Sequence, residues 1–319
     1  MYRNRSIAAV IPAYNEERQI GKVVATMPSF VDVIVIVNDC SKDRTAEVVR
    51  ELEISTGGRV KLIDLPVNQG VGGAVSAGYK YVRDKEYDVA VVMDGDGQMD
   101  PEDLPRLLDP VVEDRADYAK GNRFMRCEAY KVMPKVRFFG NAALSLLTKI
   151  ASGYWHVADS QTGYRAINLR ALKAIDWDKG YKRYGQPNDV LVSLNIHGFR
   201  VCDVPVRPVY GVGEVSTLKV RKVLFTIGWL IVKLFFKRLY QKYVIRDFHP
   251  LVFFYGFGFL LLLASLPLAI RLVVLSIVNE QVPRVNLILL VFALMSSIQF
   301  ILFAMWFDME TNRELKVKA

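Results

Sequence analysis

The chain has 319 residues, 52% of which are hydrophobic, and its mean hydropathy is +0.19. The apolar excess lies after residue 250, whereas the preceding part has the composition of an ordinary α/β domain. These values exclude a wholly soluble enzyme and also a disordered or fibrous chain. Lys and Arg outnumber Asp and Glu by 42 to 33, but they gather beside the apolar region, which indicates a membrane surface rather than nucleic acid.

The N-terminus, Met1-Tyr2-Arg3-Asn4-Arg5, runs directly into an apolar strand, so we expect no cleavable signal peptide. Three cysteines, Cys40, Cys127 and Cys202, are far apart, and the three histidines do not cluster. This spacing disfavours a zinc site and a disulfide framework, and it favours reduced thiols in the cytosol.

Apolar strands alternate with helices through the first hundred residues. The expected strands are residues 7–11, 33–37, 60–65 and 88–93, and the expected helices are residues 15–27, 43–55 and 71–83. Because the strands are apolar on both faces, the pattern predicts an α/β fold with a doubly wound, mostly parallel sheet. Ligands of such sheets bind at the carboxyl ends of the strands. Three polar clusters follow strands and should meet there: residues 12–17, 38–43 and 94–98.

The third polar cluster reads Asp94-Gly95-Asp96-Gly97-Gln98. An extended turn of this kind presents alternate oxygen ligands on one side, which suits Mg²⁺ or Mn²⁺ bridging a diphosphate. The alternative is a solvated Asp-Gly turn, which is common. Its position after a buried strand, beside two other polar strand ends, favours the metal site, with Asp94, Asp96 and Gln98 as ligands.

A glycine-rich turn at residues 68–73 opens the next helix. It lacks the Gly-Lys-Ser/Thr of a P-loop and does not fit the dinucleotide pattern, which disfavours NTP hydrolysis and NAD chemistry. Close packing between helix and strand is one explanation for the glycines. A helix N-terminus near a nucleotide would also help to bind anions.

Together these motifs resemble glycosyltransferase family 2, whose members have the GT-A nucleotide-sugar fold, and the resemblance covers roughly residues 6–215. Residues 10–17 resemble the opening motif of that family, and residues 37–43 resemble its Asp-Asp-Gly-Ser-x-Asp turn, from which Asn38 and Cys40 depart. The resemblance implies a nucleotide-sugar donor site formed by Pro12, Tyr14, Asn15, Glu17, Asn38, Asp39, Asn68, Gly70, Asp94, Gly95 and Asp96.

Further motifs resemble the polyprenyl-phosphate branch of the family, the dolichol-phosphate mannose synthase-like enzymes. Gln98 in the aspartate turn is typical of that branch, and Gly121-Asn122-Arg123 resembles its Gly-Ser-Arg. The resemblance implies that Arg123 holds the lipid phosphate together with Arg137, on an expected helix over residues 136–150. Residues 159–165 resemble the acceptor-side motif, so Asp159 is expected to orient the acceptor or to act as a modest base. The alternative without a functional role is that Arg123 and Arg137 are solvated at the surface and that Asp159 caps a loop.

Two departures refine this assignment. The Gln-x-x-Arg-Trp motif of processive polysaccharide synthases does not occur, which disfavours a processive enzyme. Residues 211–217 depart from the expected Gly-x-Ser-Lys pattern, and Lys219 could supply the missing charge.

The last third of the chain has the pattern of a membrane anchor. Residues 219–246 carry eight Lys or Arg and no Asp or Glu between apolar runs, which is typical of a helix in an anionic membrane surface. Residues 251–270 and 285–307 are apolar and long enough to span the hydrocarbon core, with residues 271–284 as their link. Basic flanks on both sides of the pair predict a multi-pass cell-membrane protein whose flanks and catalytic domain are cytoplasmic.

These features predict a GT-A domain over residues 1–217, interfacial helices over 218–248 and two transmembrane helices over 249–319. The expected reaction is inverting transfer of a hexose or N-acetylhexosamine from a nucleotide sugar to dolichyl or undecaprenyl phosphate. UDP-sugars are the first choice of donor and GDP-mannose the second. Two other classes stay open: a non-catalytic membrane subunit that binds lipid or partner enzymes, and a tethered transferase with a soluble acceptor. A homo-oligomer is also left open.

Overall fold

The structure is a computed structural model that describes residues 1–126, 135–207, 220–278 and 280–317. The chain divides into two compact units. The first comprises Met1–Phe236 and Glu314–Ala319 and contains the α/β fold, and the second comprises Lys237–Arg313 and contains a helical hairpin.

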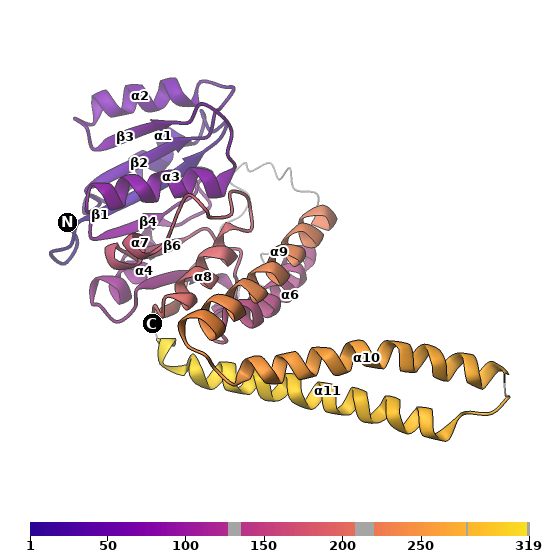
Figure 1. Cartoon of the computed structure of the whole chain (residues 1–319). Coiled ribbons are helices and arrows are strands. Elements are labelled where there is room, and N and C mark those ends of the chain that lie inside the picture. The colour runs from indigo at the N-terminus through magenta and orange to yellow at the C-terminus, as the bar shows by residue number, and fades with distance from the viewer. Residues whose placement is uncertain (127–134, 208–219, 279, 318–319) are drawn as a thin grey trace. The chain divides into compact units, whose positions relative to one another are not determined.

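A seven-stranded sheet forms the centre of the first unit, in the order β3-β2-β1-β4-β6-β5-β7 (Figure 1). The strands are β1 (Ile7–Ala13), β2 (Val33–Asn38), β3 (Val60–Asp64), β4 (Val89–Val92), β5 (Tyr118–Asn122), β6 (Arg165–Asn168) and β7 (Val201–Pro205). Four ladders are parallel, and only β6 runs antiparallel to its neighbours β4 and β5. The predicted α/β, mostly parallel sheet is therefore confirmed.

Both faces of the sheet are buried because the side chains of each strand alternate between them. Ile7, Ala9 and Ile11 of β1 join one apolar cluster with α1 (Ile20–Ala25) and α4 (Leu104–Val112). Ala8 and Val10 join the other cluster with α3 (Val71–Asp84), α7 (Leu169–Ala174) and α8 (Gln186–Ile196). The carboxyl ends of β1, β2 and β4 are thereby held side by side between two layers of helices.

The first helix is shorter than predicted, because α1 begins at Ile20 rather than at residue 15. Asn15 adopts a left-handed conformation with φ of 58°, and the backbone N–H groups of residues 15–17 bond to side chains beyond β2. These tertiary hydrogen bonds replace the first helical turn. The second helix, α2 (Thr45–Ser55), likewise begins two residues late, because Asp43 accepts a hydrogen bond from the Thr45 N–H at 3.0 Å.

Two long helices, α6 (Lys135–Ser152) and α9 (Val220–Tyr240), pack together in the first unit through a small apolar cluster (Figure 1). The cluster consists of Leu144, Ala151, Ile227 and Ile231. The prediction of a helix over residues 136–150 is confirmed, with one or two more residues at each end.

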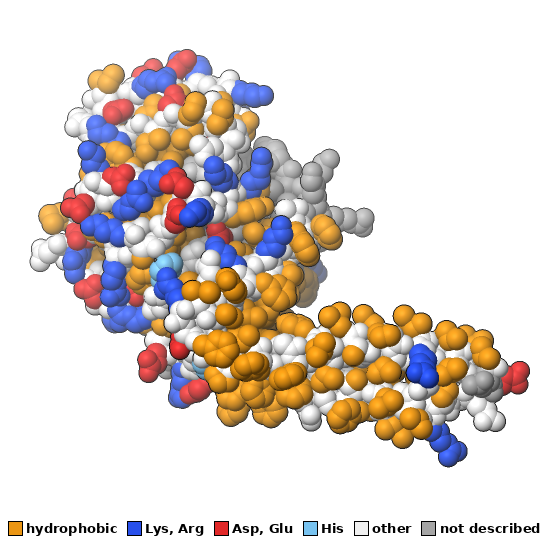
Figure 2. All heavy atoms as spheres, in the orientation of Figure 1, with side chains coloured by type: hydrophobic (Ala, Val, Ile, Leu, Met, Phe, Trp, Pro, Cys, Tyr) orange, Lys and Arg blue, Asp and Glu red, His pale blue; other side chains and the backbone are white. Residues whose placement is uncertain are grey.

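The second unit is an antiparallel hairpin of α10 (Leu251–Val278) and α11 (Arg284–Thr311), each 28 residues long with a mean hydropathy of 2.5. Few of their side chains are buried, and apolar side chains cover the hairpin along its length (Figure 2). At about 1.5 Å per residue each helix is about 42 Å long, enough to cross a bilayer. The helices are in contact where the Ser297 hydroxyl donates to the carbonyl of Gly258 at 2.8 Å, a small-residue contact common between membrane helices.

Two details of the second unit differ from expectation. The predicted link over residues 271–284 is wrong in its first half, because α10 continues through Arg271 to Val278. The residues after Arg271 are again apolar, so one charge does not end the helix. Arg238 is one of the eight basic residues for which the sequence predicts a place at a membrane surface, but its side chain is buried against Asp308, with an Nη1–Oδ1 distance of 2.7 Å. Residues 211–217 and Lys219 lie outside the described residues.

Candidate active site

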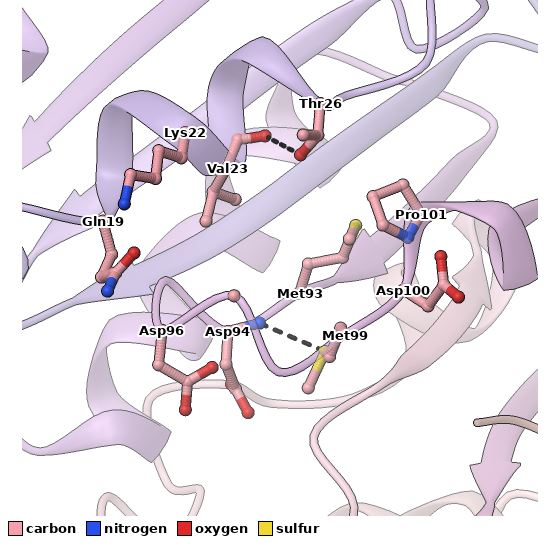
Figure 3. Close-up of a pocket in the computed structure, with 11 residues that line it drawn as sticks. Gln19, Lys22, Val23, Thr26, Met93, Asp94, Asp96, Met99, Asp100 and Pro101 are labelled. Carbon is pink, nitrogen blue, oxygen red and sulfur yellow. Dashed lines mark hydrogen bonds between the residues drawn. The ribbon is translucent and has the colours of Figure 1, made fainter. Parts of the chain in front are cut away.

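The aspartate turn leaves β4 at the sheet edge where β1 ends. Met93 N–H bonds to the carbonyl of Val10, and Gly95 lies against the carbonyl oxygen of Pro12. Asp94 and Asp96 place their carboxylates on the same side of the turn, away from Lys22 (Figure 3). The turn is held in shape by the Gln98 N–H, which donates to Asp96 Oδ1 at 3.0 Å.

A pocket of about 510 Å³ adjoins this turn. Its wall includes residues at both ends of α1 and residues of the turn itself (Figure 3): Gln19, Lys22, Thr26, Asp94, Asp96 and Asp100. The aspartate turn therefore borders a space of ligand size, although its two carboxylates point away from Lys22 on the wall of that pocket (Figure 3).

Charge is concentrated at the turn. Burial, and then the neighbouring carboxylate of Asp96, raises the pKa of Asp94 to about 7, although Arg165 and Arg123 act in the opposite direction. The pKa of Glu16 is also raised, first by burial and then by Asp96. The carboxylates of Asp94, Asp96 and Glu16 thus repel one another in a partly desolvated environment, and a bound divalent cation would offset that repulsion.

The donor set fits a magnesium or manganese ion that shares its shell with substrate. Among the described residues, no group of three or more His, Cys, Asp or Glu side chains is arranged to hold a metal by itself. Mg²⁺ is commonly held by one or two carboxylates, with phosphate oxygens and water completing the octahedron. Asp94 and Asp96 supply that number of carboxylates.

The glycine at position 163 leaves room for this arrangement. A Cβ atom at Gly163 would lie 2.7 Å from Asp94 Oδ2 and 2.9 Å from Oδ1. Any side chain there would collide with the carboxylate, so the predicted acceptor-side motif also shapes the metal side of the site.

The polar clusters after β1 and β2 are joined, as predicted. The Asn15 N–H donates to Ser41 Oγ at 3.0 Å, and Asn15 Oδ1 accepts from the Lys42 N–H at 2.8 Å. Glu17 Oε2 accepts from the Arg44 N–H at 3.0 Å. Tyr14 is 45% exposed beside them, and its ring is thus open to a ligand.

The predicted donor residues after β2 and β3 bond mainly to one another. Asp39 accepts from the N–H groups of Gln69 and Gly70 at 2.6 and 2.8 Å, and Asn68 Nδ2 donates to the Asp39 carbonyl at 3.0 Å. Asn38 Nδ2 donates to Asp64 at 2.7 Å. These contacts fix the loops around the site.

The N–H groups and glycines at the beginning of α3 also make contacts within the protein. The Gly73 N–H donates to the Lys182 carbonyl at 3.0 Å, and a Cβ at Gly72 would lie 2.5 Å from the carbonyl of Tyr181. Because Asp39 and Lys182 accept hydrogen bonds from this helix start, it does not support anion binding, one of the two explanations left open by the sequence. The glycines are explained by close packing, the alternative raised from the sequence.

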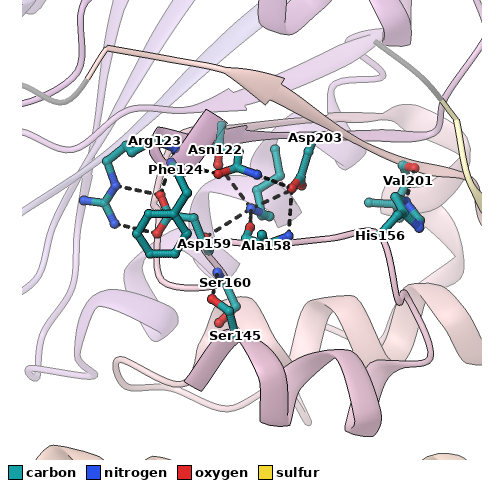
Figure 4. Close-up of polar contacts among 12 residues, drawn as sticks. Asn122, Arg123, Phe124, Ser145, His156, Ala158, Asp159, Ser160, Val201 and Asp203 are labelled. Carbon is teal, nitrogen blue, oxygen red and sulfur yellow. Dashed lines mark hydrogen bonds and ion pairs between the residues drawn. The ribbon is translucent and has the colours of Figure 1, made fainter. Parts of the chain in front are cut away.

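Arg123 and Asp159, the two residues predicted for the acceptor side, are paired with each other (Figure 4). Arg123 Nε and Nη2 donate to the two carboxylate oxygens of Asp159 at 2.7 and 2.8 Å, and the Arg123 N–H donates to Oδ2 at 3.0 Å. Burial would raise the pKa of Asp159, but the bonds from Arg123 outweigh it and lower this pKa. Asp159 is therefore an ionised, fully engaged partner of Arg123, which favours orientation over proton transfer.

Arg137 lies on the first turn of α6, but its side chain is outside the described residues. Two charged residues near the site, Lys120 and Asp203, had no place in the sequence-based prediction, whereas Glu16 and Arg165 lie within predicted motifs but had no role assigned to them. Glu16 lies beside the aspartate turn, and Lys120, Arg165 and Asp203 are buried in the strands next to it. The sequence signal that could have identified the strand residues is a single charged residue within an otherwise apolar strand.

The sheet order, the aspartate turn at the end of β4 and the arginine–aspartate pair beside it define a glycosyltransferase of the GT-A fold. Residues 8–176 match the model of glycosyl transferase family 2, and the chain belongs to this family. The predicted family and enzyme class are confirmed.

Among its relatives is the UDP-N-acetylglucosamine–dolichyl-phosphate N-acetylglucosaminyltransferase of Methanococcus voltae, 34% identical over 219 residues, which are 65% of this chain and 87% of the relative. The polyprenol monophosphomannose synthase of Mycolicibacterium smegmatis is 30% identical over 227 residues, covering 69% and 84%. A solved structure of glucosyl-3-phosphoglycerate synthase from Mycobacterium tuberculosis has a TM-score of 0.54 at 18% identity, covering 74% and 80% of the two chains, which shows the shared fold.

Proposed function

We propose that this chain is a membrane-bound, inverting glycosyltransferase that moves a hexose or N-acetylhexosamine from a nucleotide sugar to a polyprenyl phosphate. The observation that carries the proposal is the close approach of two sites with opposite charge. Gly163, four residues after Asp159, lies against the Asp94 carboxylate, where a Cβ atom would be 2.7 Å from Oδ2, so a metal-bound diphosphate and an arginine-bound phosphate would be neighbours. The names of the two relatives, both enzymes of polyprenyl or dolichyl phosphate, support this acceptor.

On the donor side, Asp94 and Asp96 would hold Mg²⁺ or Mn²⁺, with Gln98 as a third ligand. The ion, when bound, offsets the charge of the leaving diphosphate. Asn15, Glu17 and Asp39 fix the loops that surround the nucleotide, and Tyr14 offers an exposed ring to it. We infer a UDP-sugar as the first choice of donor and GDP-mannose as the second.

On the acceptor side, an oxygen of the lipid phosphate attacks the anomeric carbon while the nucleoside diphosphate leaves from the opposite face. This geometry inverts the anomeric configuration. A phosphate monoester has a second pKa of about 6, so the nucleophile is already mostly dianionic at neutral pH and needs no strong base. Arg123, held in place by Asp159, and Arg137 would orient that phosphate and balance its charge.

The first unit carries an apolar face that suits the headgroup layer of a membrane. Phe225, Trp229, Val232 and Phe236 recur every three or four residues of α9, and all are exposed. The neighbouring helix α6 exposes Phe139, Leu146 and Leu147. We propose that this face rests in the interface, where a polyprenyl phosphate presents its charged group.

The ends of the chain support a cytoplasmic catalytic domain. After α11 the chain returns to the first unit, where the Val317 N–H donates to the carbonyl of Val201 in edge strand β7 at 3.3 Å. Both ends of the hairpin are thus continuous with the catalytic unit through short segments. From the basic flanks we infer that this side is cytoplasmic. We assign catalysis to residues 1–217, surface docking to 218–248 and anchoring to 249–319.

The test is a panel of UDP- and GDP-sugars with the full chain in detergent, a short polyprenyl phosphate and Mn²⁺, scored by released nucleotide. We expect release of the nucleoside diphosphate that depends on both lipid and metal. Equal release without polyprenyl phosphate would instead indicate hydrolysis of the donor, with water taking the sugar, and would count against a lipid acceptor. Thermal stabilisation by Mn²⁺ and nucleoside diphosphate without turnover on any lipid would indicate a non-catalytic subunit.

A further inference from the structure

A buried pair of opposite charges lies beneath Arg123 and Asp159. Lys120 of β5 and Asp203 of β7 stand directly opposite each other in the parallel ladder, and Lys120 Nζ is 3.3 Å from Asp203 Oδ1. The Lys120 side chain is fully buried, and that of Asp203 is 8% exposed. Neither residue belongs to a motif recognised in the sequence.

Both members of this pair hold the backbone of residues 158 and 159. Lys120 Nζ donates to the carbonyls of Ala158 and Asp159, the latter at 3.1 Å. Asp203 Oδ2 accepts from the Ala158 N–H at 2.8 Å and from Asn122 Nδ2 at 2.6 Å (Figure 4). The segment that carries Asp159 is therefore fixed by a cation bound to its carbonyls and an anion bound to its N–H.

These hydrogen bonds to residues 158 and 159 matter because Asp159 has an uncommon backbone conformation. Its φ is 50°, in the left-handed region that residues other than glycine adopt uncommonly. The conformation persists only if surrounding contacts enforce it. In that conformation, the Asp159 carboxylate receives the three hydrogen bonds from Arg123.

A purely structural need would be met more simply by apolar side chains. Burying a lysine and an aspartate carries a desolvation penalty that their mutual attraction barely offsets, and apolar pairs are often as stable. The polar atoms of this pair are instead directed at the loop behind the candidate acceptor site.

We propose that Lys120 and Asp203 are positioning residues for the acceptor: they hold Asp159 and, through it, the Arg123 guanidinium in the orientation that receives the lipid phosphate. The inference rests on the proposed function for the identity of the acceptor. It assigns these two residues no contact with substrate. Their effect must then pass through Arg123, which separates this role from a general contribution to the fold.

The test compares Lys120→Met and Asp203→Asn with Lys120→Arg and with Lys173→Met, a control at an exposed lysine paired with Glu86. Using the full chain in detergent, we expect Lys120→Met and Asp203→Asn to raise the acceptor KM about tenfold, a loss of about 1.4 kcal/mol. Lys120→Arg should raise the acceptor KM less than Lys120→Met does, because it keeps a positive charge at this position. The Kd for UDP with Mn²⁺, or for GDP if that is the active donor, should stay within about twofold. The control should match the unaltered chain.

The decisive measurement adds each change to Arg123→Ala. A residue that acts through Arg123 should have no further effect on the acceptor KM once Arg123 is gone, whereas independent effects multiply. Multiplying effects, an unchanged acceptor KM in a folded variant, or parallel losses of donor and acceptor affinity would overturn the proposal. So would loss of the folded state in both variants, because the pair would then be structural. If the unaltered chain does not glycosylate polyprenyl phosphate, it is the proposed function that fails.

Discussion

The base of the hairpin contains an ion pair whose removal should destabilise the second unit strongly. Asp308 accepts hydrogen bonds from Arg238 at 2.7 and 3.0 Å, from the Tyr243 hydroxyl at 2.6 Å and from Asn312 Nδ2 at 3.0 Å. The side chains of Arg238 and Asp308 are 1% and 0% exposed. Asp308→Asn leaves the Arg238 cation buried without a counter-charge, and breaking a buried pair in this way costs about 3–5 kcal/mol.

The assay is equilibrium unfolding of the full chain in mixed micelles of a mild and a denaturing detergent. We expect Asp308→Asn and Arg238→Met each to lower the free energy of unfolding by about 3 kcal/mol or more. The double variant Arg238→Met with Asp308→Leu should recover much of the loss, because no unpaired charge remains buried. Glu310→Gln is the matched control, since its partner Arg313 is exposed and such pairs contribute at most about 1 kcal/mol. A loss below about 1 kcal/mol for Asp308→Asn, or additive losses in the double variant, would refute the reasoning.

Four further predictions concern the first unit. Asp96→Ala should nearly abolish turnover, by about 10³-fold or more, whereas Asp159→Asn should leave measurable activity because the acceptor needs no strong base; equal and complete loss in both would contradict that argument. Arg123→Ala should raise the acceptor KM and lower kcat more than it weakens donor binding, and an unchanged acceptor dependence would rule out its role. Gly163→Ala should displace the aspartate turn, since its Cβ would lie 2.7 Å from the carboxylate of Asp94, and titration of the folded variant with Mn²⁺ and UDP should show weaker binding. His156, whose Nε2 lies 2.9 Å from the Val201 carbonyl, has a pKa lowered mainly by burial. In the unfolded chain His156 is protonated as the pH falls below about 6.5, whereas in the folded chain it stays neutral to lower pH. The free energy of unfolding should therefore fall as the pH drops below about 6.5. His156→Gln should flatten that part of the curve, and an unchanged slope in thermal unfolding between pH 5 and 7 would show that another group is responsible.

The local sequence pattern predicted the structure correctly where the residues of a single segment determine it. The uninterrupted apolar runs before the aspartate turn and after residue 250 predicted a buried sheet and two spanning helices. The placement of Asp94 and Asp96 at the carboxyl end of a strand also followed from local sequence, because a polar pair after an apolar strand must emerge at the sheet edge.

Local pattern failed where distant partners compete for the backbone. The start of α1 is unwound because Ser41, Thr45 and Asp43 take the N–H groups that a helix would have used. For the start of α3 the sequence left close packing and anion binding open, and in the structure Asp39 and Lys182 accept its N–H groups. Both outcomes depend on which loops the parallel ladder places beside each other, and periodicity does not contain that information.

The amino-acid order by itself determined the class of fold, the family motifs and the two helices long and apolar enough to span a membrane, since each depends on composition and spacing within one segment. Only the tertiary structure decided that Lys120 meets Asp203 and that Arg238 meets Asp308, 70 positions away. A charge in an apolar strand or helix is unfavourable until its counter-charge arrives, and sheet order and helix packing determine which residue supplies it. For the same reason, Asp159 is a partner of Arg123 rather than a solvated loop residue.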